Sequence, residues 1–314
     1  MPKICYDPQR LNPDTRKVID QANTILEEYA EAGYAITLRT LYYQFVARDI
    51  LPNNEKSYKR LGDIVGKGRL AGLIDWNHLE DRTRYLAELS HWGGVQDALD
   101  SLPGQFRIDM WKNQAWRPEV WIEKDAVAGI VAGVCHELDI PYFSCRGYVS
   151  LSEMWRASMR LRANIAGGYT PYIIHFGDHD PSGIDMSRDI VDRLNKTFMA
   201  DCSFKRVALN MDQIELYKPP PNPAKITDPR AQAYLDEYGD ESWELDALNP
   251  RKFREIIEGE VIPLRDEKQW KADLKDSEKM VQQLSEVAKN WDKALTKKKV
   301  VKKAAKKATK KRKA

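Results

Sequence analysis

The sequence predicts an α/β protein with an N-terminal winged helix-turn-helix domain, a Rossmann-like domain with a mostly parallel sheet, and a basic, disordered C-terminal tail. Between residues 111 and 262, short runs of Val, Ile, Trp, Tyr and Phe alternate with helical patterns. This alternation is typical of parallel strands joined by crossover helices. The N-terminal 110 residues show mainly helical periodicity, and the last 18 are rich in Lys and Ala, a composition that favours disorder.

The length of 314 residues is enough for more than one domain. We place boundaries at 1–110 for the winged-helix domain, 111–262 for the domain with the parallel sheet, 263–296 for a C-terminal helix, and 297–314 for the tail. The net charge is +3, but the tail holds 11 basic and no acidic residues, which leaves 39 basic against 47 acidic residues elsewhere. An acidic body with a basic tail is common in chains that meet nucleic acid.

The four cysteines are scattered, with no Cys-x-x-Cys and no histidine cluster. This pattern argues against a zinc site and favours a reducing compartment. The N-terminus lacks an apolar signal region, and no apolar run is long enough to span a bilayer. We therefore expect a cytoplasmic, DNA-associated protein without a membrane partner.

The N-terminal domain begins with an amphipathic pattern over residues 13–32, followed by a helix over 38–48 that Thr37 can cap. A third helix over 57–69 directs apolar residues inward. The run Leu73-Ile74-Asp75-Trp76 is then expected to form a strand that opens a wing. In such a domain the third helix docks in a DNA groove, and its candidate DNA contacts are Lys59, Arg60, Lys67 and Arg69. The alternative is that these charges form only a solvated surface.

In the larger domain, apolar runs predict strands ending near residues 122, 144, 176 and 209, with helices over 125–138, 151–166 and 182–198 between them. The Pro-rich stretch 217–230 is expected to be an ordered loop. The segment Trp243-Glu244-Leu245-Asp246-Ala247-Leu248 carries acids that we interpret as structural. A helix follows Pro250, and residues 265–295 predict one long polar helix.

Three carboxylates follow predicted strands directly. Glu123 follows the first strand, and Asp178 and Asp180 follow the third. Ligands gather at the carboxyl ends of strands in open α/β sheets, and converging carboxylates repel each other unless a cation lies among them. Hard oxygen donors suit Mg²⁺. One alternative is an acidic turn without a metal. Another is an EF-hand loop ending at Asp189, which Pro181 and the preceding strand disfavour.

These motifs resemble a known family. A Glu after one strand and Asp-x-Asp-Pro-x-Gly after a later one resemble the Toprim domain of topoisomerases and some nucleases. More narrowly, Glu-Lys-Asp-Ala at 123–126, Arg146-Gly147-Tyr148 and the motif at 178–183 resemble the A subunit of topoisomerase VI and the related meiotic double-strand-break transesterase. The resemblance covers roughly residues 10–260 and is closest to the reduced "mini-A" forms. It implies a Toprim fold, Mg²⁺ as cofactor, double-stranded DNA as substrate and a homodimer.

The resemblance also points to a nucleophile. Arg39-Thr-Leu-Tyr42-Tyr43 is similar to the family's Arg-x-x-Tyr-Tyr, whose second tyrosine attacks DNA, so the position implied here is Tyr43. Adjacent helical residues point about 100° apart, so one ring can pack while the other reaches the site. Arg39 lies one turn before Tyr43, where it can bind the scissile phosphate and favour the phenolate. The alternative is that both rings belong to the core.

The expected function is a Mg²⁺-dependent DNA-cleaving transesterase, an isomerase of the topoisomerase type IIB A-subunit kind. It would form a phosphotyrosyl link to DNA and, as a dimer, a double-strand break, with the tyrosine of one protomer facing the metal of the other. Strand passage would require a separate ATPase B-type subunit. Two rivals remain: a hydrolytic Toprim nuclease in which Tyr43 is structural, and a non-enzymatic DNA-binding protein that uses mainly its tail.

Overall fold

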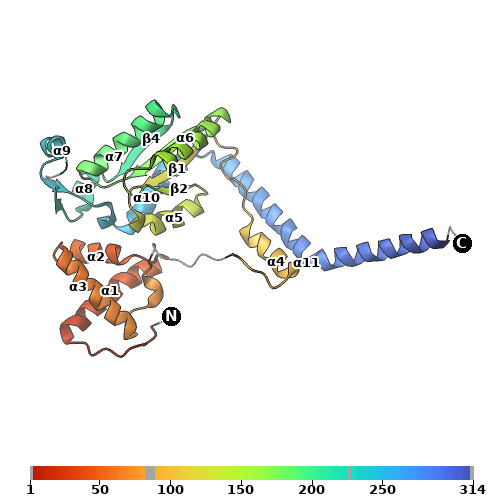
Figure 1. The fold of residues 1–314 in the computed structure, drawn as a ribbon, viewed down its shortest axis with the longest axis horizontal. Coiled ribbons are helices and arrows are strands. Elements are labelled where there is room, and N and C mark those ends of the chain that lie inside the picture. Colours follow the sequence, from red (N-terminus) through yellow and green to blue (C-terminus); the bar gives the residue numbers. More distant parts are fainter. Residues whose placement is uncertain (1–2, 82–88, 225–227, 229, 312–314) are drawn as a thin grey trace. The chain divides into compact units, whose positions relative to one another are not determined.

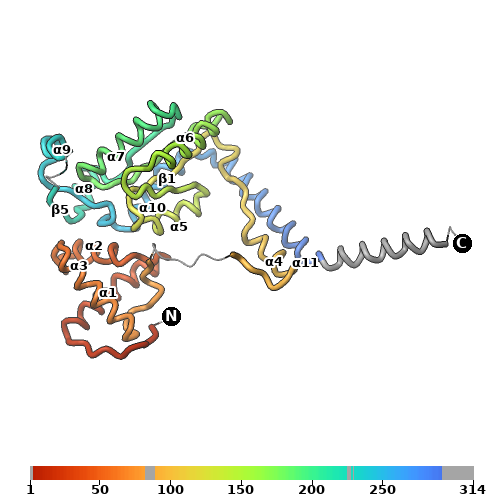
Figure 2. The backbone as a smooth tube through the Cα atoms, in the orientation of Figure 1, coloured from red at the N-terminus to blue at the C-terminus, as the bar shows by residue number. Residues whose placement is uncertain are grey.

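The computed structural model describes residues 3–81, 89–224, 228 and 230–311 of the 314, with side chains up to residue 291. The described chain is mixed α/β, with a four-stranded parallel sheet and eleven α-helices (Figure 1). Two compact units are present: Met1–Tyr85 with Ala115–Arg265, and Leu86–Gln114 with Asp266–Ala314. Figure 2 traces the same chain as a tube.

The first unit begins with three helices, α1 (Pro13–Glu31), α2 (Leu38–Ala47) and α3 (Glu55–Leu70). Each starts at a side chain that accepts a backbone N–H, and the predicted cap Thr37 accepts from Thr40, which satisfies an otherwise unpaired donor. The three helices enclose one apolar cluster that includes Ile25, Leu41, Phe45 and Leu61. The three predicted helices are confirmed.

The strand predicted over residues 73–76 is wrong. Ile74 is buried in the cluster of the three helices, and the chain turns into a short 3-10 helix, η1 (Trp76–His78). Asp75 explains the turn, because its side chain accepts the N–H of Asn77 at 2.9 Å, a local bond that competes with a strand ladder. A wing is therefore not confirmed, and its continuation through residues 82–88 lies outside the described residues.

The sheet contains β1 (Trp116–Ile122), β2 (Tyr142–Ser144), β3 (Thr170–Phe176) and β4 (Ser203–Ala208) in the order β2-β1-β3-β4. All three pairings are parallel. Ile122, the last residue of β1, lies opposite Phe176, the last residue of β3. The residues that follow these two strands therefore emerge side by side at one edge of the sheet.

Helices cover both faces of the sheet (Figure 1). On one face, α6 (Leu151–Ala166) and α7 (Pro181–Val191) pack through Leu161 and Ile190 against Trp121 and Ile173. On the other face, α5 (Ala128–Glu137) lies beside α10 (Pro250–Val261), and Phe253 stacks on Phe176. The alternation of side chains along β3 thus fixes two buried faces.

Several smaller elements complete this unit. Between β4 and α10 lie α8 (Met211–Tyr217), β5 (Asn222–Pro223), α9 (Ala231–Tyr238), β6 (Glu241–Ser242) and η4 (Leu245–Ala247). The short turns are η2 (Asp125–Val127) before α5, η3 (Asp192–Thr197) after α7 and η5 (Ile262–Leu264) after α10. The Pro-rich segment predicted as a loop contributes β5, which pairs antiparallel with β6; its residues 225–227 and 229 lie outside the description.

The second unit contains α4 (Val95–Gln105) and the long α11 (Glu267–Lys311). Trp111 meets Trp270 edge to face, and Asn113 donates to Asp273 at 2.8 Å. The expected helix over 265–295 is present, but it continues to Lys311, where we expected no regular structure. Lys and Ala both have high helix propensity, which accounts for the difference. Within the described part of the chain, no helix combines the length and apolarity needed to cross a membrane.

Candidate functional site

Glu123 and Asp178 meet at the carboxyl edge of the sheet. The N–H of Glu123 donates to the carbonyl of Phe176 at 2.8 Å, which extends the pairing of β1 with β3 by one residue. The N–H of Asp178 then donates to Oε2 of Glu123 at 2.8 Å. The predicted meeting of these two carboxylate residues is therefore present, and parallel pairing causes it.

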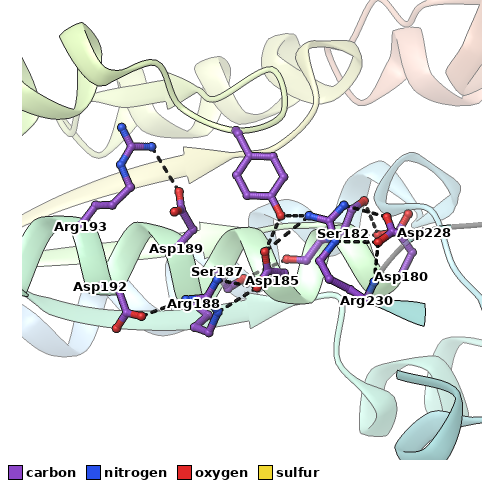
Figure 3. Close-up of polar contacts among 12 residues, drawn as sticks. Asp180, Ser182, Asp185, Ser187, Arg188, Asp189, Asp192, Arg193, Asp228 and Arg230 are labelled. Atoms are coloured by element: carbon purple, nitrogen blue, oxygen red, sulfur yellow. Dashed lines mark hydrogen bonds and ion pairs between the residues drawn. The ribbon is translucent and has the colours of Figure 1, made fainter. Parts of the chain in front are cut away.

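Asp180 is the N-cap of α7. Its Oδ1 accepts from Ser182 Oγ at 2.9 Å and from the N–H of Gly183 at 2.6 Å (Figure 3). Gly183 is required by a close approach, since a Cβ there would lie 2.3 Å from the carbonyl oxygen of Asp178 and 3.1 Å from Glu123 Oε2. The helix begins at Pro181, so the EF-hand loop does not exist, and Asp189 of α7 instead pairs with Arg193 of the following η3 (Figure 3).

The gathered carboxylates perturb each other. Burial, followed by the negative charge of Asp178, raises the pKa of Glu123 to about 7. Burial also raises the pKa of Asp178, against the pull of the Lys124 ammonium. Both pKa values are raised for the same reason. The carboxylates are buried close to one another, and the nearby positive charge is too small to offset the cost of ionising them.

Lys124 supplies part of the positive charge. Its Nζ lies 2.7 Å from Asp178 Oδ2 and 3.6 Å from Asp246 Oδ1, and it also contacts Glu244 Oε2. The N–H of Leu245 donates to the other Asp178 oxygen at 2.7 Å. The turn at η4 thus adds two acids to the cluster that sequence reasoning assigned only a structural role. No motif spacing ties residues 244 and 246 to residue 178.

A buried arginine secures the turn after β3. Arg206 donates to the carbonyl oxygens of Gly177 at 2.9 Å, Asp178 at 2.6 Å and Leu209 at 3.1 Å. Burial lowers its pKa, yet the bonds to three carbonyls offset part of the cost of burying the charge. Sequence reasoning missed Arg206, because a lone Arg within a strand pattern gives no signal.

The predicted magnesium ligands fit the ion by chemistry. All three are carboxylates, and among the described residues Glu123 Oε1 and Asp180 Oδ2 accept no hydrogen bond. Asp178 Oδ2, by contrast, is paired with Lys124. In the described parts of the chain, no three His, Cys, Asp or Glu side chains are already arranged to hold a metal ion. The donors are therefore suitable, but their present geometry is that of an internally paired cluster.

The tyrosine pair on α2 divides into two roles. The Tyr42 hydroxyl accepts the N–H of Asn54 at 2.7 Å and donates to carbonyls of the same loop, including that of Asn54 at 3.0 Å, so this ring holds the loop before α3. Tyr43 instead lies beside Arg39, whose Cζ is 5.7 Å from the ring centre. Arg39 also donates from Nε to Asp246 Oδ2 at 2.5 Å and from a terminal nitrogen to Glu244 Oε2 at 3.0 Å.

A cavity of about 360 Å³ adjoins Tyr43; its lining residues are Arg39, Tyr42, Tyr43, Asn53, Asn54, Glu55, Tyr58 and Asn222. Burial, followed by the charge of Asp246, raises the pKa of Tyr43 to about 12, and the opposing effects of Arg39 and Asn222 are smaller. We expected Arg39 to favour the phenolate. The charge of Arg39 does lower the pKa of Tyr43. The charge of Asp246, with which Arg39 is paired, raises that pKa by more.

The four predicted DNA contacts on α3 do not share one environment. Lys59, Arg60 and Lys67 are exposed, and Lys59 pairs with Glu55 one turn earlier at 2.7 Å. Arg69 lies with its guanidinium 4.3 Å from the ring centre of Trp76 and donates to the Trp76 carbonyl at 3.0 Å. This pairing attaches η1 to the end of α3.

The remaining motif residues also make defined contacts. Arg146 pairs with Asp125 at 3.2 Å, and the Tyr148 hydroxyl donates to Asp185 Oδ2 on α7 at 2.5 Å. Arg230 contacts the same Tyr148 hydroxyl and pairs with Asp228 (Figure 3). The segment at 146–148 is thereby linked to the helix that Asp180 caps. Comparisons of the chain with protein-family models, with curated proteins and with solved structures found no match.

Proposed function

We propose that this protein is a Mg²⁺-dependent DNA transesterase of the topoisomerase VI A-subunit type. One observation carries the proposal: Arg39 lies beside Tyr43 and is bonded to Asp246, and Lys124 joins Asp246 and Glu244 to Asp178. The candidate nucleophile and the candidate metal ligands of the same chain are thus connected by charged side chains within one unit. This connection favours a site built within one chain over the expected site that two protomers share. Tyr43 is at the same time a member of the buried cluster of the three helices, with only 6% of its surface exposed, and its ring adjoins the cavity beside Arg39.

In the proposed reaction, Tyr43 Oη attacks a backbone phosphorus and the deoxyribose 3′ oxygen leaves. The resulting ester between tyrosine and the DNA 5′ end conserves the free energy of the phosphodiester bond that was broken, so the reaction can reverse and rejoin the strand. Because the pKa of Tyr43 is raised to about 12, its proton departs during the attack rather than before it, and the departing 3′ oxygen takes up a proton and leaves as a hydroxyl. Arg39 orients the phosphate, and Glu123, Asp178 and Asp180 would hold Mg²⁺, which neutralises charge on the phosphate.

The proposed partners are those that the resemblance to the topoisomerase VI A subunit implies. Double-stranded DNA is the proposed substrate, and a homodimer is proposed because one tyrosine per chain cuts one strand, and a two-fold dimer matches the two-fold of duplex DNA. Exposed Lys59, Arg60 and Lys67 on α3 are the proposed phosphate contacts. A separate ATPase B-type subunit would be needed for strand passage.

The test incubates supercoiled DNA with the protein and Mg²⁺, stops the reaction with detergent, and analyses it with and without protease. The proposal predicts linear DNA that migrates normally only after protease treatment. Asp178→Asn should abolish cleavage and retain DNA binding. Asp189→Asn, which removes an acid of α7 outside the cluster, should cleave as the wild type does.

The two rival functions give different results. Cleaved DNA that never carries protein indicates a hydrolytic nuclease. Binding without cleavage by wild type at any Mg²⁺ concentration indicates a DNA-binding protein that is not an enzyme. Cleavage that persists in Asp178→Asn would separate the activity from the carboxylate cluster.

A further inference from the structure

The Lys124 ammonium lies among three acids of the carboxylate cluster, Asp178, Glu244 and Asp246. The Lys124 side chain is only 17% exposed, and its ammonium lies 2.7 Å from Asp178 Oδ2. This oxygen is one of the ligands in the proposed cation site. A lysine ammonium and a divalent cation are both attracted to it, and one carboxylate oxygen rarely serves two cations at contact distance.

Asp246 offers the same ammonium a second position. The Asp246 side chain is fully buried, and its Oδ1 has no hydrogen-bond partner, although it lies 3.6 Å from Lys124 Nζ. A buried carboxylate oxygen without a hydrogen bond is costly. The neighbouring Glu244 already contacts Lys124 and would contact the ammonium in either position.

We propose that Lys124 is a resident counter-cation that controls metal access to the site, and that it moves from Asp178 to Asp246 when a divalent cation binds Asp178. This inference rests on the proposed cation site and deepens it by naming the residue that regulates its occupancy. The movement closes the gap to Asp246 Oδ1 and releases Asp178 Oδ2. Lys124 acts as a positioning residue, since it contacts the ligands rather than the reacting atoms.

The contact between Lys124 and Asp178 therefore lowers the affinity of the site for a divalent cation. With Lys124 on Asp178, a divalent ion has to displace a buried ion pair, which weakens its binding. Once it is bound, Lys124 on Asp246 and Glu244 neutralises the two acids nearest Arg39. Those acids then hold the Arg39 guanidinium less strongly, so that it can turn to a DNA phosphate.

The test measures binding of Mn²⁺, a spectroscopic substitute for Mg²⁺, to the full chain by electron paramagnetic resonance of the free ion. Lys124→Met, which keeps the apolar stem, should bind Mn²⁺ at least about tenfold more tightly than wild type, because a competing charge a few ångströms away is removed. Asp246→Asn should bind more weakly. The matched control is Lys205→Met, which breaks a 2.6 Å ion pair with Glu260 elsewhere in the unit and should leave the affinity unchanged.

A double-mutant cycle separates the two ways in which Asp246 can act. If Asp246 acts by receiving Lys124, then Asp246→Asn has little effect once Lys124→Met is present. An equal loss in both backgrounds would show that Asp246 attracts the cation only by its charge, and would overturn the proposed movement. Unchanged or weaker binding by Lys124→Met would overturn the competition itself.

Two further outcomes keep the inference distinct from the proposed function. If neither wild type nor Lys124→Met binds Mn²⁺ at millimolar concentration, the cation site itself fails, and the inference fails with it. If both bind equally, the site stands and only the role of Lys124 is removed. Should Lys124→Met unfold, Lys124→Gln, which removes the charge but keeps a side chain that can donate to Asp178, replaces it in the same cycle with Asp246→Asn.

Discussion

The backbone N–H of Asp178 donates to Oε2 of Glu123 at 2.8 Å, across 55 residues of sequence. This bond places a carboxylate of one strand end against the backbone of the next strand end. It excludes alternatives in which the two acids lie on separate surfaces. It also makes the geometry of the cluster depend on the tight turn between β3 and α7.

Gly183→Ala should disturb that turn. The new Cβ would lie 2.3 Å from the carbonyl oxygen of Asp178, so Asp178 or the start of α7 has to shift, at a cost of about 1–3 kcal/mol. Chemical unfolding should show this loss, together with lost DNA cleavage. Gly133→Ala in α5 has no heavy atom within 4 Å of its new Cβ and should stabilise the protein slightly. Equal stability of the two variants would contradict the close approach.

The sequence was sufficient to predict the parts of the fold that local pattern determines. The helices α1 to α3, the strands β1 to β4 and the meeting of Glu123 with Asp178 follow from periodicity and from parallel pairing. The strand at residues 73–76 was wrong because Asp75 caps a turn and Ile74 fills the helical core. Lys124, Arg206 and Asp246 were missed as members of the site. Their contacts arise from tertiary packing and have no spacing rule in the sequence.

Arg39→Lys should reduce cleavage at least about tenfold and leave folding intact. Lysine keeps the charge but loses the planar fork that here binds Asp246 and Glu244 and that would bind two oxygens of a DNA phosphate in the reaction, a geometry that an ammonium cannot reproduce. The matched control is Arg48→Lys just after α2, where a similar fork binds Glu28, which is not one of the acids of the cluster. Single-turnover cleavage rates measure the effect. A rate equal to that of the control variant would remove Arg39 from the reaction.

His179→Gln should change the dependence of stability on pH. Burial, followed by the charge of Arg206, lowers the pKa of His179 to about 4 from its usual 6.5. The unfolded chain therefore takes up a proton below about pH 6.5 that the folded chain refuses until about pH 4, so this histidine makes the fold less stable as pH falls. The variant should lose less stability than wild type between pH 6.5 and 4, by up to about 3 kcal/mol.

Urea unfolding at a series of pH values measures this difference. Glutamine can keep the hydrogen bond that Nδ1 of His179 shares with Tyr234 Oη at 2.7 Å, so the comparison at pH 7 reports the cost of the substitution alone. Parallel curves for wild type and variant would show that His179 takes up its proton equally in the folded and unfolded states.

Removal of residues 297–314, which hold 11 basic and no acidic residues, should weaken DNA binding for every sequence. Each phosphate contact contributes about −0.9 to the slope of log affinity against log salt on duplex DNA, so the slope should become shallower. Cleavage at saturating DNA should survive. Fluorescence anisotropy at several salt concentrations provides the slopes, and identical slopes would show that the segment does not contact phosphate.

Mass spectrometry of the trapped adduct shows whether Tyr43 becomes covalently linked to DNA. Nuclease and trypsin treatment should release the peptide between Arg39 and Arg48, which contains both tyrosines of the pair. If Tyr43 is the nucleophile, the nucleotide is found on Tyr43, Tyr42→Phe cleaves normally provided that it folds, and Tyr43→Phe forms no adduct. An adduct on any other residue, or undiminished cleavage by Tyr43→Phe, would contradict that role.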